Sequence, residues 1–162
     1  MKKLLRLANY LVVPSILLVL LVNQALAAPW NGIEPFKSRR ADLERILGKP
    51  AGEGSNGTLR FSVAGGTAIV TFVDKKFVTT KRLRPELEGT VLLIVLQHEG
   101  SSDTPESMGL TKNRSLDHED VQGASIFRNL KDGVAYTFIN GNLRTTRFTF
   151  STDQFSRARR GR

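Results

Sequence analysis

The spacing of hydrophobic positions changes along the chain, and the first clear spacing is that of a helix. Three apolar side chains recur at the i, i+3, i+4 positions that share one helix face: Leu43, Ile46 and Leu47. We expect Ser38 to cap the start of this helix by accepting a main-chain hydrogen bond. Gly48 can adopt the left-handed conformation that ends a helix, and Pro50 prevents its continuation.

After a glycine-rich turn the period falls from 3.6 residues to two, which predicts half-buried strands. Leu59, Phe61 and Val63 alternate with polar residues, whereas the unbroken apolar run 91–96 suits a central strand covered on both faces. Asn140-Gly141 is the strongest of several hairpin-turn signals between the later strands. Six strands are expected in all: residues 59–63, 67–73, 91–96, 125–127, 134–139 and 143–150.

Each half of the chain is expected to contain a helical segment and three strands, which predicts two similar units side by side. The expected fold class is α+β: a single domain over residues 28–151, with an antiparallel sheet of about six strands and two helical segments packed on one face. We place the second helical segment within residues 99–121, from Thr104-Pro105-Glu106 or over residues 116–121. The basic residues 152–162 are expected to form a disordered tail.

The N-terminus has the features of a secretory signal peptide. Its parts follow one another along the chain: the cations Lys2, Lys3 and Arg6, the apolar run 11–22, and the small-x-small site Ala25-Leu26-Ala27. We expect residues 1–27 to be cleaved, which gives an exported protein, periplasmic or extracellular. The alternative is an uncleaved anchor, but the apolar run contains Pro14 and is shorter than the about 20 residues of a spanning helix. No later segment is apolar for long enough to be transmembrane.

Charge and cysteine content narrow the partners of the exported chain. The full sequence has 24 Lys and Arg against 15 Asp and Glu, and cleavage removes three cations, which leaves 21 against 15 and a net charge of +6. This charge favours an anionic envelope surface or an acidic envelope protein as partner. Nucleic acid is not expected, because the compartment is wrong. The chain has no cysteine, so disulfides and thiol chemistry are excluded.

One basic segment between the second and third expected strands is the main candidate contact site. Five cations lie on this connection: Lys75, Lys76, Lys81, Arg82 and Arg84. The functional interpretation is an electrostatic dock on an anionic surface or partner. The alternative is charge that serves solubility alone.

The sequence contains partial matches to dinucleotide-binding, metal-binding and nucleophile motifs, but none has the sequence context that its function requires. The G-x-G-x-x-G match over residues 52–57 follows a helix and precedes a strand, which reverses the order of a dinucleotide site. The acidic and histidine residues 117–120 are adjacent, and adjacent side chains rarely converge on one metal ion. The sequence has no G-x-S-x-G nucleophile motif, since Gly123-Ala124-Ser125 continues with Ile126-Phe127. The sequence therefore predicts no enzyme, cofactor or metal site.

The opening of the expected mature chain resembles a family of small uncharacterised exported bacterial proteins. The residues that carry this resemblance are a lead-in Trp30-x-Gly32-Ile33-x-Pro35 and a helix that ends Leu47-Gly48-x-Pro50. The later Gly133-Val134-x-Tyr136 and Asn140-Gly141 are similar too. More loosely, the helix resembles those of small outer-membrane-assembly lipoproteins and of the secreted β-lactamase inhibitor protein. Both of these relatives bind other proteins, so the resemblance implies a binding role.

These observations predict a non-enzymatic binding or scaffold module of the periplasm or cell envelope. It would recognise its partner through the face of the sheet or through the basic connection. The first alternative is a secreted inhibitor, which should present a rigid protruding loop to a target enzyme. The second is a hydrolase that uses His98 or His118, which requires a cleft where either histidine lies beside a serine or carboxylate.

Overall fold

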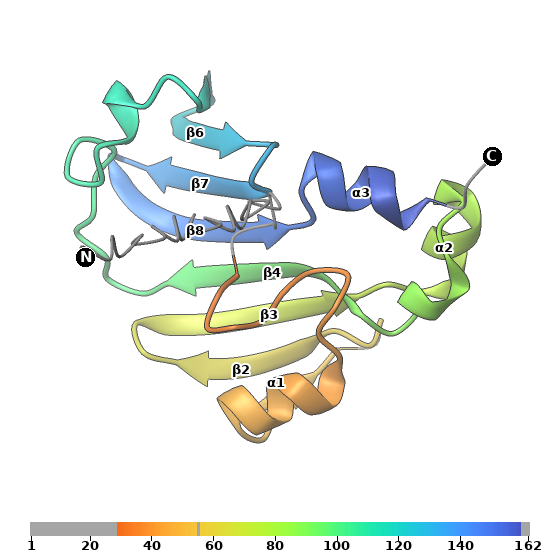
Figure 1. Ribbon diagram of the computed structural model, residues 1–162. Helices are drawn as coiled ribbons and strands as arrows, with labels where there is room; N and C mark the ends of the chain where they lie inside the picture. The colour runs from red at the N-terminus through yellow and green to blue at the C-terminus, as the bar shows by residue number, and fades with distance from the viewer. Residues whose placement is uncertain (1–28, 55, 160–162) are drawn as a thin grey trace, which may run out of the picture.

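An antiparallel sheet of eight strands forms the centre of the protein in the computed structural model, which describes residues 29–54 and 56–159 (Figure 1). The order across the sheet is β1-β2-β3-β4-β8-β7-β6-β5. The strands are β1 (Gly52–Glu53), β2 (Leu59–Val63), β3 (Gly66–Phe72), β4 (Val91–His98), β5 (Asp117–Val121), β6 (Ala124–Asn129), β7 (Val134–Ile139) and β8 (Asn142–Thr149). The expected α+β class and single antiparallel sheet are confirmed.

Each half of the chain folds as a four-stranded meander, and the two meanders join where β4 pairs with β8. All six expected strands are present, but the expected number is too low by two because β1 and β5 lie at the edges of the sheet. β1 has only two residues, and all five residues of β5 are exposed. Neither strand carries the apolar alternation that marks a half-buried strand in a sequence.

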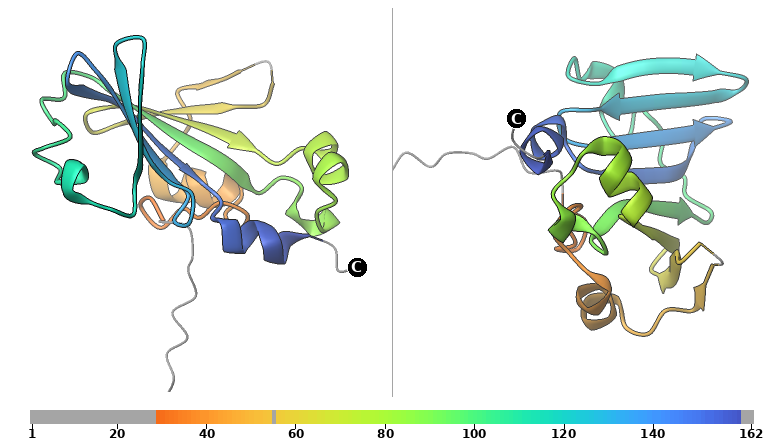
Figure 2. Two further views of the ribbon diagram at one scale, coloured as in Figure 1. Left: turned by 90° about the horizontal axis from the view of Figure 1, so that it is seen from above. Right: turned by 90° about the vertical axis from the view of Figure 1, so that its right-hand side faces the viewer.

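Three α-helices and two short 3₁₀ turns complete the described part of the chain. They are α1 (Arg40–Leu47), α2 (Lys75–Lys81), η1 (Pro85–Leu87), η2 (Leu110–Lys112) and α3 (Thr152–Ala158). Figure 2 shows that α1 lies against one face of the twisted sheet, whereas α2 and α3 lie together at one end of it. None of the helices in the described residues is long and apolar enough to cross a membrane. The predicted signal peptide lies outside the described residues.

The covered face of the sheet carries two hydrophobic clusters, one in each half. In the first half, Leu43 of α1 packs with Phe61, Ile94 and other side chains of β2, β3 and β4. In the second half, Leu110 of η2 packs against Phe127, Phe138 and Leu143. Burial of this face holds α1 and the segment 99–116 on the same side of the sheet.

Several expected local structures are wrong in detail. Ser38 does not cap α1, because its hydroxyl accepts from the Glu34 N–H at 2.9 Å; Asp42 instead accepts from the N–H of the N-cap residue Arg39. The expected helix over residues 116–121 is mostly strand β5, and Thr104-Pro105-Glu106 lies in a turn that precedes η2.

The segment between β3 and β4 is a helix rather than the plain connection that we expected. The Asp74 carboxylate caps α2 by accepting from the Phe77 N–H at 2.6 Å, and Arg82 ends the helix in a left-handed conformation with φ of 54°. Phe77 and Val78 belong to a third cluster, which Phe155 and Ala158 of α3 complete. This cluster joins the two helices at one end of the sheet.

The expected disordered tail is wrong for residues 152–158, which form α3; residues 160–162 lie outside the described residues. Ser151 and Gln154 start this helix with a reciprocal capping box, in which the Ser151 hydroxyl accepts from the Gln154 N–H at 3.1 Å. The basic composition concealed this signal, because Phe155 and Ala158 are the only apolar residues that α3 contributes to the cluster.

Ser151→Ala is expected to lower the free energy of unfolding by about 0.5–2 kcal/mol, because it removes the N-cap of α3. Ser156→Ala, on the exposed side of the same helix, is the matched control and should change it by less than about 0.5 kcal/mol. Urea unfolding followed by circular dichroism measures both. Equal effects of the two substitutions would contradict the capping role of Ser151.

Candidate functional site

The face of the sheet opposite α1, here called the open face, carries half-exposed side chains on its central strands. The strand register places five of them in one row across β3, β4, β8, β7 and β6: Ile69, Val95, Arg147, Ala135 and Arg128. None of the five is buried, although their chain neighbours Val70, Ile94 and Phe127 on the covered face are. The central strands therefore present a partly apolar surface that this chain's described residues leave accessible.

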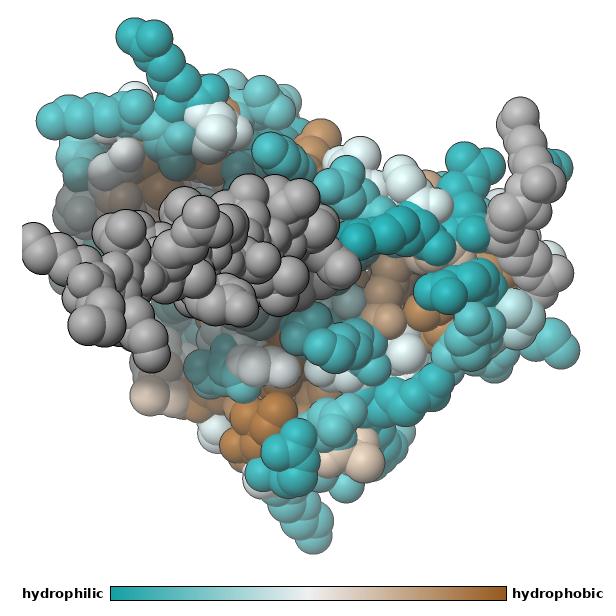
Figure 3. All heavy atoms as spheres, viewed as in Figure 1, coloured by the Kyte–Doolittle hydropathy of each residue, from teal (hydrophilic) through white to brown (hydrophobic). Residues whose placement is uncertain are grey.

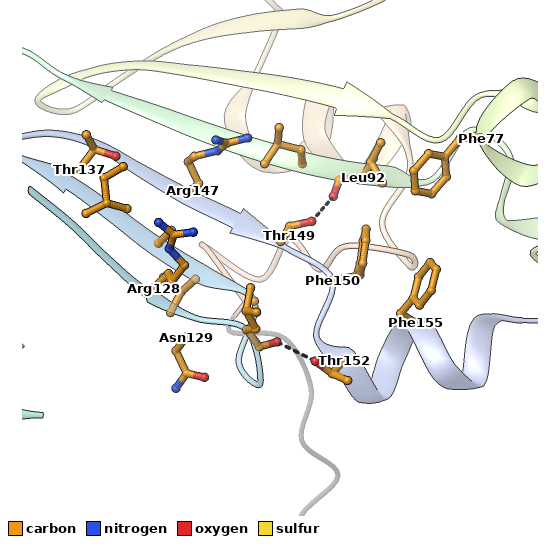
Figure 4. A pocket seen from close by; sticks show the side chains of 16 residues that line it. Phe77, Leu92, Arg128, Asn129, Thr137, Arg147, Thr149, Phe150, Thr152 and Phe155 are labelled. Carbon is orange, nitrogen blue, oxygen red and sulfur yellow. Dashed lines mark hydrogen bonds between the residues drawn. The ribbon is translucent and has the colours of Figure 1, made fainter. Parts of the chain in front are cut away.

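A groove of about 640 Å³ lies on the open face and extends to the end of the sheet where α2 and α3 lie (Figure 4). Leu93, Ile126 and Ala135 are among the side chains of β4, β6 and β7 that line it. The threonines Thr137 and Thr149 add hydroxyl groups to this lining. The groove is thus mainly apolar, with a few polar groups that could orient a ligand.

Three phenylalanines form one end of the groove. Phe150 follows β8 and stacks on Phe155 of α3 with ring centroids 5.1 Å apart. Phe77 of α2 lies at 6.3 Å from Phe150 in a tilted arrangement. Behind them, Phe36 stacks on Phe150 at 4.6 Å. These contacts fix the rings in place, so the aromatic end is a preformed part of the site.

Two arginines lie away from the aromatic end, and they are the charged residues of the groove lining. The guanidinium of Arg128 pairs with Glu119 of the neighbouring strand β5. Arg147 is exposed and has no hydrogen-bond or ion-pair partner among the described residues. Ala135 separates the two in the row, so their strands are about 10 Å apart with a small side chain between them. Arg147 is therefore free to bind an anionic group.

The large hydrophobic side chains that are most exposed in the described structure also lie along the open face. Leu130 is 64% exposed and lines the groove. Val121 and Ile139 are 41% and 43% exposed, and both pair with Ala124, two residues before Ile126 on the same strand face. Apolar surface gathered on one face is typical of a binding surface.

The five cations of the predicted contact site lie on and after α2, and all are exposed. The structure adds two arginines of the C-terminal segment to them, because the Arg84 N–H donates to the Ala158 carbonyl at 2.9 Å and Leu83 forms a β-bridge with Arg159. We call this group the basic end; its residues are Lys75, Lys76, Lys81, Arg82, Arg84, Arg157 and Arg159. Arg84 also pairs with Glu86 at 3.5 Å.

The two histidines lie in different parts of the sheet. His98 Nε2 lies 2.9 Å from the Thr146 hydroxyl. His118 stacks on Phe127 and approaches the Asp120 carboxylate at 3.2 Å on the edge strand β5. The Ser125 hydroxyl donates to Asp120 rather than to His118, and this bond, followed by the effect of His118, lowers the pKa of Asp120. No serine–histidine pair is therefore formed at this edge.

The acidic and histidine residues of β5 alternate between the two faces of the sheet. Asp117 and Glu119 pair with Arg128 and Ile126 on the open face, whereas His118 and Asp120 lie on the opposite face. This alternation keeps the four side chains from converging, and no group of three or more metal-binding side chains occurs among the described residues. The glycine-rich residues 52–57 form β1 and its turn into β2, with residue 55 outside the described part.

No family model, curated protein or solved structure matches the chain. The resemblance to small exported bacterial proteins therefore stays a prediction.

Proposed function

We propose that the protein is an exported, non-enzymatic binding module that holds a single-chain anionic amphiphile in the groove of its open face. The observation that carries the proposal is an apolar groove with an aromatic end and an unpaired arginine, Arg147. The ligand class is an acyl chain with a carboxylate or phosphate head. Export follows from the predicted signal peptide and fits a lipid-rich envelope as the source of such a ligand.

Both the main chain and the side chains of the groove favour an apolar chain as the ligand. Strands β4, β8, β7 and β6 are each paired on both sides, so their N–H and C=O groups are already used in the sheet. An extended peptide laid in the groove would find few partners for its own main chain, and unpaired polar groups are costly to bury. An acyl chain has no such groups and gains from contact with Leu93, Ile126 and the phenylalanines.

The charge of the groove favours an anionic head group on the ligand. The groove lining contains Arg128 and Arg147 but no aspartate or glutamate, although Glu119 pairs with Arg128 from β5. Arginine binds carboxylate and phosphate with two parallel hydrogen bonds. The same charge disfavours a second copy of this chain as the occupant, because face-to-face pairing would bring the arginines of two copies together.

The size of the groove and the loops of the structure also support this proposal. A volume of about 640 Å³ falls within the range of about 300–1,000 Å³ that is usual for small-molecule sites. The long segment 99–116 packs Met108, Leu110 and Leu116 onto the sheet instead of protruding from it. That packing gives less support to the alternative of an inhibitor with an exposed loop.

Arg147→Ala is expected to weaken binding of a long-chain fatty acid to the purified protein by about tenfold or more, because a hydrogen-bonded charge is worth about 1.5–3 kcal/mol. Arg144→Ala is the matched control: it removes the same charge from the same strand, at an exposed position where the pairing of β8 with β7 shifts register and outside the groove lining. It should change the affinity less than about threefold. Displacement of a fluorescent fatty-acid probe measures both.

Chain length and head group separate this ligand from other apolar molecules. Each methylene removed from the fatty acid should weaken binding, since a buried methylene contributes about 0.8 kcal/mol. The corresponding alcohol should bind weakly to the native protein and be insensitive to Arg147→Ala. Two results would contradict the proposed function. One is an equal effect of Arg144→Ala and Arg147→Ala on affinity, and the other is that no fatty acid of any chain length displaces the probe from the folded protein.

A further inference from the structure

We propose that the basic end docks on an anionic lipid bilayer and thereby places the aromatic end of the groove next to the membrane. The juxtaposition that carries this inference is built from two helices far apart in sequence. On their exposed sides α2 carries three lysines and α3 carries Arg157, and each helix has a phenylalanine, Phe77 or Phe155, on its inner side. In Figures 1 and 2 the two helices lie together at one end of the sheet.

The charge of this end is available for a partner. Lys75, Lys76 and Lys81 have no ion pair or hydrogen bond from their ammonium groups among the described residues. The carboxylates of the same segments are Asp74, which caps α2, Glu86, which pairs with Arg84, and the exposed Glu88 and Asp153. Seven cations therefore face four carboxylates, and two of these carboxylates already have partners within the chain. The surplus is positive and complements an anionic surface.

The shape of the basic end fits a surface better than a small ligand. Its cations sit on the outside of short helices, and Figure 3 shows mostly hydrophilic side chains over α2 and α3 with hydrophobic ones between them. Each lysine or arginine near an anionic bilayer strengthens binding of a protein to that bilayer by about fivefold. Long basic side chains beside half-buried aromatic rings are also typical of the polar–apolar boundary of a membrane.

Continuity with the groove favours a bilayer over an acidic protein as the partner. Phe77 and Phe155 line the end of the groove and belong to the helices that carry the cations. An acyl chain that leaves a bilayer at this end would meet the aromatic rings first and Arg147 farther along the sheet. The transfer of ligand rests on the proposed function, but the docking itself does not and can be measured without ligand.

The test is flotation of the purified protein with vesicles of phosphatidylcholine containing 30% phosphatidylglycerol, compared with phosphatidylcholine alone. The triple variant Lys75→Gln/Lys76→Gln/Lys81→Gln should bind the anionic vesicles about tenfold or more weakly than the native protein. The matched control Lys49→Gln/Lys112→Gln/Arg114→Gln removes three exposed cations that lie on other elements, after α1 and in or after η2. It should stay within about threefold of the native protein, and 0.5 M salt should release both proteins.

Three outcomes would overturn the docking proposal: no binding to anionic vesicles, equal binding to neutral vesicles, or equal loss in the two triple variants. The last outcome would mean that net charge alone acts. Circular dichroism verifies that each variant is folded. The Lys75→Gln/Lys76→Gln/Lys81→Gln variant should still bind the fluorescent fatty-acid probe in the absence of vesicles. The Arg147→Ala variant should still float with anionic vesicles. Failure of fatty-acid binding alone would therefore reject the proposed function and leave the docking proposal standing.

Discussion

Phe138→Ala is expected to lower the free energy of unfolding by about 3–5 kcal/mol, whereas Ile139→Ala beside it should cost less than about 1 kcal/mol. The two residues are neighbours on β7 and lie on opposite faces of the sheet. Phe138 is 1% exposed and meets Phe127 edge to face at 5.8 Å in the second-half cluster. Ile139 is 43% exposed on the open face. Only the first substitution therefore leaves a cavity.

Urea unfolding of the two variants, followed by circular dichroism with one m value, gives the comparison. The result bears on function as well as on stability, because it identifies which face of the sheet is the core. A larger cost for Ile139→Ala than for Phe138→Ala would mean that the open face is the buried one. The groove would then have no place in a binding role.

Gly66→Ala is expected to destabilise the protein by more than about 2 kcal/mol, a loss that is large for one methyl group. Gly66 begins β3 with φ of 150°, a backbone conformation that residues other than glycine rarely adopt. A Cβ built there would lie against the Gln97 carbonyl of β4, closer than two nonbonded atoms can approach. The pairing of β3 with β4 near Gly66 would have to shift, because the clash is with backbone.

Gly65→Ala is the control for this prediction, since Gly65 has φ of 80° but nothing within 4 Å of a Cβ. It should cost only the about 1–2 kcal/mol of a left-handed alanine. Thermal or urea unfolding of the pair separates backbone strain from steric contact. Equal losses in the two variants would show that the close approach of β3 and β4 at Gly66 does not limit stability.

The strands of the core could be predicted from the sequence because they are marked by runs or alternation of hydrophobic residues. The run 91–96 is the centre of β4, and the alternation around Phe61 forms β2, as predicted. Elements held by polar contacts were missed. Asp74 caps α2 and Ser151 caps α3, but each helix is too short to show two full turns of apolar periodicity. The charged strand β5 pairs through its main chain, which leaves no pattern in its side chains.

The groove could not be predicted, because its residues come from α2, β4, β6, β7, β8 and α3 and meet only when the two meanders join. The sequence did contain one signal: Arg128 directly follows the apolar pair Ile126-Phe127, and Arg147 stands between Thr146 and Phe148 within an expected strand. The sequence also located the five cations of the basic segment. It could not place Arg157 and Arg159 beside them, because that contact depends on α3 returning to the end of α2.

The outer edge of β5 determines how copies of this protein behave when they meet. An edge strand has unpaired main-chain groups, and another sheet can extend from them into a fibre. Here Asp117, Glu119 and Asp120 occupy three of the five positions on that edge. A second copy aligned there would bring carboxylates of both chains together, which opposes strand addition. The strand that the sequence pattern concealed thus opposes aggregation through this edge of the sheet, in a protein with an exposed apolar face.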